Sequence, residues 1–297
     1  MDYIIGVDAG GTKTEAIAYD IEGNALLKSL KGFGNLVNNK EQALNNIVAS
    51  TKEIVEKLGS NDLKGLYLGV AGSEVGENTK IIRDKIKNKL SLDAVVINDG
   101  ELALKAMLKG ENGILTIAGT GSIAFGINDN KSARSGGWGH LLGDEGSGYK
   151  IAVDAIKIMI HEKDYNLEKC NLTKEIMNKL NIKSVDEIIS FVYSSTKDDI
   201  ASISPLLSKL GDEGDEVARM ILAREGLALG RTTESVYKKL GFKKAYIGLV
   251  GGVIKNSKIL RVAFEEYLRE KINVIDFVDE EISSTKGAYY MYLKENK

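Results

Sequence analysis

The sequence is poor in the residues that cross-link small proteins or bind structural metals. Its 297 residues include one cysteine, Cys170, and two histidines. A single cysteine excludes an internal disulfide, and so few thiol and imidazole groups argue against a zinc or iron–sulfur site built from this chain alone. The formal net charge of -2 lacks the basic excess that is typical of nucleic-acid-binding proteins.

Long apolar runs are also missing. No apolar stretch approaches the ~20 residues of a membrane span. Residues 1–9 read as a buried strand rather than a signal peptide, because they lack a basic start and a small-residue cleavage site. We therefore expect a cytoplasmic protein with no membrane and no nucleic-acid partner. The chain length is more typical of two domains than of one.

Strand and helix patterns alternate along the chain, and the alternation starts again near Gly113. The first run predicts strands at 3–8, 14–20, 25–31, 66–71 and 94–97, with helices over 44–58, 81–90 and 100–108. The second predicts strands at 114–118, 122–128, 132–136, 245–250 and 273–277, with mostly helical structure over 146–240 and a helix from 256 or 257 to 269. Ser204 is predicted to cap a helix that has Pro205 in its first position. This alternation predicts sheets with parallel strands and covered faces, and the second run reads as a copy of the first.

A glycine-rich turn follows the first strand. Asp8 ends an apolar run, and Gly10, Gly11, Thr12 and Lys13 come directly after it. Glycines allow backbone amides to approach phosphate oxygens, and an aspartate here can hold magnesium through water. The alternative is a hairpin turn with a solvated lysine. The segment is not a Walker motif, because no Gly-Lys-Ser/Thr opens a helix.

Two further turns repeat this pattern after later strands. The segment Gly119-Thr120-Gly121 offers the same phosphate-binding chemistry, and Gly251-Gly252 suits adenine and ribose with little side-chain contact. Each could instead be a plain tight turn. Together, the turns after Asp8 and after residue 118 predict a triphosphate held between two facing domains.

An aspartate follows the strand predicted at 94–97. Asp99 would lie at the carboxyl end of that strand, where parallel sheets place their ligand sites. Its carboxylate could accept the proton of an attacking hydroxyl. The alternative is a structural one, in which Asp99 caps the helix over 100–108.

The segment 136–147 is rich in glycine and holds the only tryptophan, Trp138. Asp144 could bind sugar hydroxyls, and glycine amides would let a sugar ring approach closely. His140 and Glu145 are expected to orient this segment rather than react. Trp138 could instead be an ordinary core residue.

The order of these motifs resembles that of the sugar kinase, heat-shock chaperone and actin superfamily. Within it, the chain is similar to the BadF/BadG/BcrA/BcrD-type ATPase family, on its N-acetylglucosamine kinase branch. The resemblance covers essentially the whole chain and is most specific over residues 136–147. It implies an α/β fold of two ribonuclease-H-like (actin-like ATPase) domains with a cleft between them. We expect an N-terminal domain over 1–118, a C-terminal domain with a helical insertion over 119–283, and a final helix over 284–297 that packs back on the first domain.

The resemblance also implies roles for individual residues, with ATP and Mg²⁺ as cofactors. Asp99 matches the catalytic base and a sugar contact, Asp8 the magnesium-linked aspartate, and Thr12 and Thr120 the phosphate-binding threonines. Asn35 matches a sugar-binding asparagine, although Gly34-Asn35 alone reads only as a turn. Further matches are Gly10, Gly11, Lys13, Gly119 and Gly121 for phosphate, Gly251 and Gly252 for adenosine, and Gly137, Trp138, Gly139 and Asp144 for the sugar.

The implied activity is ATP-dependent phosphorylation of the 6-hydroxyl of N-acetylglucosamine, N-acetylmuramate or both, in salvage of cell-wall sugars. The alternatives are a glucosamine or other hexose kinase of the same fold, and a non-catalytic ATP- or sugar-binding regulator. Asp99 favours a kinase, because a pure binder would not need a base. The acceptor preference stays open, as does the cation that would meet a lactyl carboxylate (Lys13, Arg134 or Lys150). Related kinases are often dimers, so a homodimer is one option.

Overall fold

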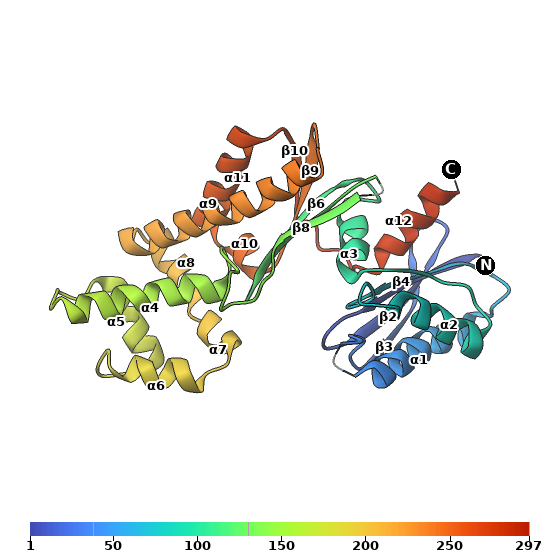
Figure 1. Cartoon of the computed structure of the whole chain (residues 1–297), viewed down its shortest axis with the longest axis horizontal. Helices are drawn as coiled ribbons and strands as arrows, with labels where there is room; N and C mark the ends of the chain where they lie inside the picture. The colour runs from blue at the N-terminus through green and yellow to red at the C-terminus, as the bar shows by residue number, and fades with distance from the viewer. Residues whose placement is uncertain (38, 130, 297) are drawn as a thin grey trace. The chain divides into compact units, whose positions relative to one another are not determined.

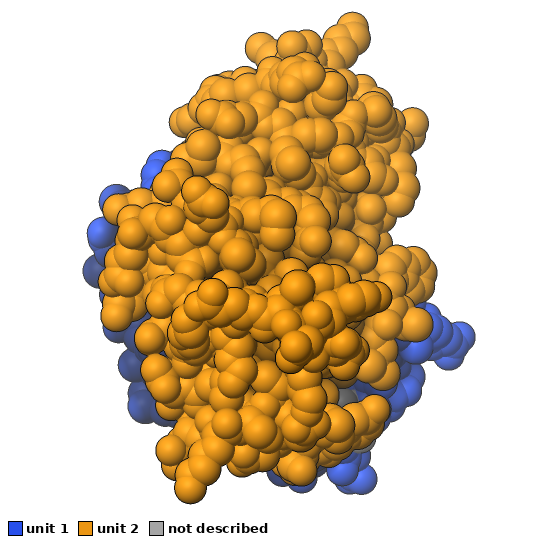
Figure 2. Space-filling model, turned by 90° about the vertical axis from the view of Figure 1, so that its left-hand side faces the viewer, with its two compact units in different colours: residues 1–113, 280–297 blue, residues 114–279 orange. Residues whose placement is uncertain are grey.

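The computed structural model describes residues 1–37, 39–129 and 131–296. The chain forms two compact units, which Figure 2 colours separately. Unit 1 contains residues 1–113 and 280–297, and unit 2 contains residues 114–279. The unit boundaries thus fall close to the domain boundaries expected near residues 118 and 283, and the last segment of the chain belongs to unit 1.

Unit 1 is built on a five-stranded sheet of order β3-β2-β1-β4-β5 (Figure 1). Its strands are β1 (Tyr3–Ala9), β2 (Thr14–Asp20), β3 (Ala25–Lys31), β4 (Leu63–Val70) and β5 (Val95–Ile97). β1 pairs antiparallel with β2 and parallel with β4, and β4 pairs parallel with β5. The carboxyl ends of β1, β4 and β5 therefore share one edge, which is where parallel sheets bind ligands.

Alternate side chains of β1 are buried on opposite faces of this sheet. Ile5 and Val7 pack with α1 (Lys40–Leu58) and α2 (Asn78–Leu90). Ile4 packs on the other face, in a cluster with Leu102 of α3 (Asp99–Met107) and Ala288 of α12 (Lys286–Glu295). Because both faces of β1 are covered, its sequence is a continuous apolar run rather than an alternating one.

Unit 2 repeats the strand arrangement of unit 1. Its strands are β6 (Gly113–Ala118), β7 (Ser122–Asn128), β8 (Lys131–Gly136), β9 (Ala245–Val250) and β10 (Val274–Val278), in the order β10-β9-β6-β7-β8. In both sheets the first three strands are neighbours in sequence order, and the fourth and fifth extend the sheet from the other side of the first strand. The shared topology agrees with the predicted duplication.

Unit 2 carries most of the helices of the described chain (Figure 1). They are α4 (Gly148–Asp164), α5 (Asn171–Leu180), α6 (Glu187–Ser194), α7 (Lys197–Ala201), α8 (Ser204–Asp212), α9 (Glu216–Lys239), α10 (Gly252–Asn256) and α11 (Lys258–Lys271). α9 packs against α11, β7 and β8, whereas α4 contacts α5, α7 and α8. No helix in the described part of the chain is long and apolar enough to cross a membrane.

Two predicted helix starts were wrong by one residue. Asn98, not Asp99, is the N-cap of α3, because the Asn98 side chain accepts the hydrogen bond from the Gly100 N–H at 2.8 Å. Asp99 is instead the first residue of α3, and its carboxylate accepts the same Gly100 N–H at 2.9 Å, so it shares in capping this helix. Ile203, not Ser204, precedes α8, since the backbone at Ile203 is already helical where α7 runs into α8.

Candidate active site

Two carboxylates lie together at the sheet edge of unit 1. Asp8 is near the end of β1, and Asp99 opens α3 directly after β5. Burial, reinforced by the nearby negative charge of Asp99, raises the pKa of Asp8 to about 6. Burial, with the negative charge of Glu74 adding to it, also raises the pKa of Asp99. A raised pKa makes a carboxylate a better proton acceptor near neutral pH, so Asp99 has the electrostatic character of a general base.

The glycine-rich turn after β1 supports the loop that carries Asn35. The Gly10 N–H donates to the Lys13 carbonyl at 3.0 Å and closes the turn. The Gly34 N–H then donates to the Gly10 carbonyl at 2.8 Å, which fixes the Asn35 loop on the turn. Unit 1 thus brings the predicted sugar-binding asparagine next to the predicted phosphate turn. Lys13 itself forms an ion pair with Glu15 at 3.4 Å.

The possible metal ligands in unit 1 fit magnesium better than a metal whose ligands all come from protein side chains. No group of three or more His, Cys, Asp or Glu side chains that could hold a metal occurs among the described residues. Asp8, near the end of β1, offers hard carboxylate oxygen. Magnesium is commonly bound by one or two carboxylates together with water and phosphate oxygens, so Asp8 is the residue that would hold it.

In unit 2, the first turn of α4 fixes the second small-residue turn. The Gly148 N–H donates to the Gly119 carbonyl at 2.8 Å, and the Tyr149 N–H donates to the Thr120 carbonyl at 3.3 Å. The Gly119 N–H donates to the Gly121 carbonyl at 2.9 Å within the turn. The turn is therefore rigid, and its Thr120 side chain is left half-exposed beside two cavities.

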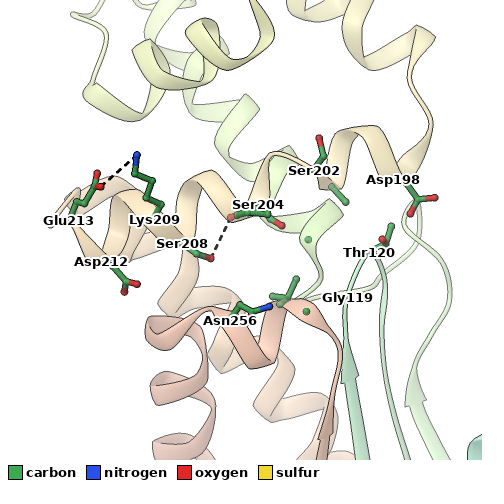
Figure 3. Close-up of a pocket in the computed structure, with 15 residues that line it drawn as sticks. Gly119, Thr120, Asp198, Ser202, Ser204, Ser208, Lys209, Asp212, Glu213 and Asn256 are labelled. Atoms are coloured by element: carbon green, nitrogen blue, oxygen red, sulfur yellow. Dashed lines mark hydrogen bonds and ion pairs between the residues drawn. The ribbon is translucent and has the colours of Figure 1, made fainter. Parts of the chain in front are cut away.

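The larger cavity, of about 770 Å³, has a size suited to a nucleoside (Figure 3). Gly119 and Thr120 form one wall, and Gly252 and Asn256 of α10 form another. The remaining wall comes from α7 and α8, with charged and hydroxyl side chains: Asp198, Ser202, Ser204, Ser208, Lys209, Asp212 and Glu213. Most of these residues carried no signal in the sequence, because they come from helices far along the chain from the glycine motifs.

Gly251 explains how the turn after β9 meets the turn after β6. Its φ is +106°, and a Cβ placed there would lie 2.3 Å from the Ala118 carbonyl oxygen. Only glycine adopts this backbone shape without strain and permits such a close approach. The two predicted nucleotide motifs are therefore in direct contact through their backbones.

The smaller cavity, of about 410 Å³, joins the phosphate turn to the tryptophan segment. It is lined by Thr120, Gly121, Gly137, Gly139 and Asp144, among others. The Gly139 N–H donates to Oδ1 of Asp144 at 3.2 Å, which folds the segment toward Gly121. Both cavities are lined by Gly119 and Thr120, so the predicted phosphate turn separates a nucleoside-sized space from the predicted sugar contacts.

Trp138 is not a core residue, since 65% of its surface is exposed. The Arg134 guanidinium lies over its ring, 4.8 Å from the centroid. The rings of His140 and Tyr149 meet edge to face, with their centroids 4.6 Å apart. The Glu225 carboxylate in α9 accepts a hydrogen bond from the Gly146 N–H at 2.8 Å and so attaches the segment 136–147 to α9.

Sequence reasoning missed Glu225 and Asn256. The first supports the tryptophan segment, and the second lines the large cavity. Asn256 follows the predicted Gly251-Gly252 motif by one helical turn, which was a usable signal. Glu225 lies far along the chain from the group that it contacts, so nothing local could reveal it.

Comparison with known proteins gives the family and the fold of the chain. The BadF/BadG/BcrA/BcrD ATPase family matches residues 5–289. The chain is 33% identical to the N-acetylmuramic acid/N-acetylglucosamine kinase of Clostridium acetobutylicum over 97% of each chain, and 28% identical to the N-acetyl-D-glucosamine kinase of Dictyostelium discoideum over 100% of this chain and 99% of that protein. A crystal structure of a ROK family glucokinase from Streptomyces griseus, in complex with glucose and AMPPNP, shares the two-domain, actin-like α/β fold with a TM-score of 0.55 and 17% identity over 98% of each chain. The predicted family is thereby confirmed: the chain belongs to the BadF/BadG/BcrA/BcrD ATPase family.

Proposed function

We propose that this chain is an ATP-dependent kinase that phosphorylates the 6-hydroxyl of N-acetylglucosamine, N-acetylmuramate or both. The observation that carries the proposal is the pair of partly buried carboxyls with raised pKa, Asp8 near the carboxyl end of β1 and Asp99 just after β5. Phosphoryl transfer needs a carboxylate that holds magnesium and a base that accepts the proton of the attacking hydroxyl. Asp8 can supply the first and Asp99 the second. The names of the two curated relatives support the choice of acceptor.

In the proposed mechanism, Asp99 orients the sugar 6-hydroxyl and accepts its proton as the oxygen attacks the γ-phosphorus. The bond from the γ-phosphorus to the bridging oxygen breaks, and ADP leaves with that oxygen. Magnesium, when bound, neutralises charge on the phosphate oxygens, and Asp8 would hold it through water. The hydroxyls of Thr12 and Thr120 bind phosphate oxygens, together with those amides of the two turns that are not already bonded within them, as the amides of Gly10 and Gly119 are.

In this proposal, the two cavities of unit 2 bind the nucleotide and the sugar. The 770 Å³ cavity takes adenosine against Gly251 and Gly252, and its shared wall at Thr120 directs the phosphates toward the smaller cavity. Gly137, Trp138, Gly139 and Asp144 contact the sugar there. In unit 1, Asn35 and Asp99 contact the sugar. The exposed Trp138 ring offers an apolar face of the kind on which a pyranose can lie.

We further propose that the protein works in the cytoplasm in the salvage of cell-wall amino sugars. The test is a panel of N-acetylglucosamine, N-acetylmuramate, glucosamine and glucose with radiolabelled ATP and magnesium. The expected result is stoichiometric sugar 6-phosphate and ADP with one or both N-acetylated sugars. ATP binding without turnover on any sugar would contradict the proposal and favour a regulator of the same fold. Turnover confined to glucosamine or glucose would reassign the acceptor.

A further inference from the structure

The turn that begins at Asp144 is closed by one backbone hydrogen bond and lies against α9. The Ser147 N–H donates to the Asp144 carbonyl at 3.1 Å. Glu145 and Gly146 are therefore the central residues of the turn. Gly146 has a φ of +80°, the value that a type II turn requires at this position. A Cβ placed on Gly146 would lie 2.7 Å from the Cβ of Leu229, so glycine also permits the close approach to α9.

The peptide group between Glu145 and Gly146 is held at both ends by side chains. Its carbonyl oxygen accepts a hydrogen bond from the hydroxyl of Ser122, the first residue of β7, at 2.7 Å. Its N–H donates to Oε2 of Glu225, in α9, at 2.8 Å. Type I and type II turns differ mainly in the orientation of this central peptide group. The two bonds therefore hold the turn in one of these two forms.

The Glu225 carboxylate is itself held in place through its second oxygen. Oε1 of Glu225 lies 3.7 Å from Nε of Arg224, and the same guanidinium forms an ion pair with Asp154 of α4 at 2.5 Å. Only 3% of the Glu225 surface is exposed, and this burial raises the pKa of its carboxyl, with the negative charge of Asp154 adding to the rise. A buried ion pair contributes little to stability, because the loss of hydration offsets the attraction. The hydrogen bond to the turn is therefore the better explanation of a buried carboxylate here.

Asp144 depends on this turn for its conformation. Its φ is +62°, a left-handed value that costs free energy in a residue other than glycine. Its Oδ1 accepts the Gly139 N–H at 3.2 Å, and its Oδ2 would lie 2.8 Å from a Cβ on Gly121. Asp144 thereby lines the smaller cavity, where the proposed function places the sugar. A turn that could change its form would let Asp144 relax out of this conformation.

We propose that Glu225 is a positioning residue for the acceptor sugar, because it holds the central peptide of the turn and thereby fixes Asp144 at the smaller cavity. The inference rests on the proposed function, which assigns Asp144 to the sugar. Glu225 is not among the residues that line either cavity, so it acts through the turn. The competing explanation is that Glu225 only joins α9 to α4 through Arg224 and Asp154, in which case the sugar site gains nothing from it.

The test compares Glu225→Met with Glu234→Met, the same substitution on the same helix. Glu234 is a matched control, because its carboxylate accepts a hydrogen bond from the Tyr267 hydroxyl of α11 at 2.7 Å and lies outside the turn. Steady-state kinetics of the full chain give separate KM values for sugar and for ATP. Since a hydrogen bond to a charged group is worth about a tenfold change in affinity or more, Glu225→Met should raise the sugar KM about tenfold and the ATP KM less than about twofold. Glu225→Gln, which keeps an acceptor for the Gly146 N–H, should stay within about threefold of the wild type.

Hydrogen exchange measured by mass spectrometry gives a second readout that needs no sugar. In Glu225→Met the amides of residues 143–148 should exchange about tenfold faster or more than in the wild type, because the turn opens more easily without its acceptor. The rest of the chain should keep its exchange rates, and so should Glu234→Met throughout. If Glu225→Met does not fold, Ser122→Ala removes the bond at the other end of the same peptide group and should show the same local effect.

A purely structural role of Glu225 predicts a different pattern. Equal rises in both KM values, or faster exchange throughout unit 2, would overturn the inference, and so would wild-type behaviour of Glu225→Met. Glu225→Gln as defective as Glu225→Met would also contradict it, since the acceptor would then not be what matters. A wild-type chain that phosphorylates no sugar fails the proposed function, and the exchange rates still decide whether Glu225 holds the turn. A working kinase whose sugar KM ignores Glu225 fails this inference alone.

Discussion

Asp8 is the residue where function and stability conflict most clearly. Its carboxyl is partly buried, and this burial is the main reason that its pKa rises to about 6, with the negative charge of Asp99 adding to it. At neutral pH the Asp8 carboxyl is therefore mostly ionised, although its surroundings favour the protonated, neutral form. A bound cation would relieve this, which supports the proposed role of Asp8 in holding magnesium.

The first prediction concerns the base. Asp99→Asn keeps the shape of the side chain but cannot accept a proton, so turnover should fall about 10²- to 10⁴-fold. Sugar affinity should change much less, because an amide still forms hydrogen bonds. Steady-state kinetics with the preferred sugar and sugar binding by calorimetry measure the two effects. Near-normal turnover in a folded Asp99→Asn protein would remove the catalytic assignment.

The second prediction follows from the raised pKa of Asp8. Since the folded-state pKa lies above the ordinary value of 3.8, the contribution of this carboxyl to stability is full below about pH 3.8 and is lost as the pH rises through 6. Asp8→Asn should therefore stabilise the nucleotide-free protein by about 1–3 kcal/mol at pH 8 and by much less at pH 4. Urea unfolding at both pH values measures this. Equal effects at both pH values would show that Asp8 is not destabilised in the folded protein.

A third prediction concerns the cation for an acidic sugar. Lys13 is paired with Glu15, whereas Arg134 lies over the predicted sugar-binding ring of Trp138. We expect Arg134→Gln to lower kcat/KM for N-acetylmuramate about 3- to 10-fold more than for N-acetylglucosamine, since exposed charge pairs are worth little more than this. Lys131→Gln, on the same strand, is the matched control. An equal loss on both sugars would point to a structural role in holding Trp138.

At the scale of elements, the strands and the local turns could be predicted because they depend on neighbouring residues. The β-branched run at β1 and the glycine pairs after β1 and β9 are visible in a short stretch of sequence. Helix starts were less certain, because Asn98 competes with Asp99 for the same cap. The α7 and α8 wall of the large cavity could not be predicted, since it depends on how distant helices pack.

The fourth prediction tests the turn that joins β9 to α10. Gly251→Ala meets both a positive φ and the Ala118 carbonyl oxygen, whereas Gly241→Ala meets a positive φ of +63° with nothing within 4 Å. Backbone strain alone should cost about 1 kcal/mol at Gly241. Overpacking should add about 1–3 kcal/mol at Gly251 and weaken nucleotide binding. Chemical unfolding and nucleotide titration of both variants measure the difference, and equal costs would contradict the close approach of the two turns.

At the scale of the whole molecule, the duplicated topology divides the chemistry between the units. Unit 1 holds Asp8, Asp99 and Asn35, while unit 2 holds the two cavities described above and the tryptophan segment. The sequence indicated this duplication only weakly, because the two copies share their strand order rather than their side chains. What each unit binds is therefore set by its loops and not by the sheet that they share.

Unit 1 also has a consequence for how the protein is made. One of its cores contains Ile4 and Leu102 together with Ala288, so it needs a helix that leaves the ribosome after all of unit 2. Nascent chains generally fold domain by domain from the N-terminus. Here the part of unit 1 that is synthesised first keeps an open apolar face until all of unit 2 and then α12 have been synthesised.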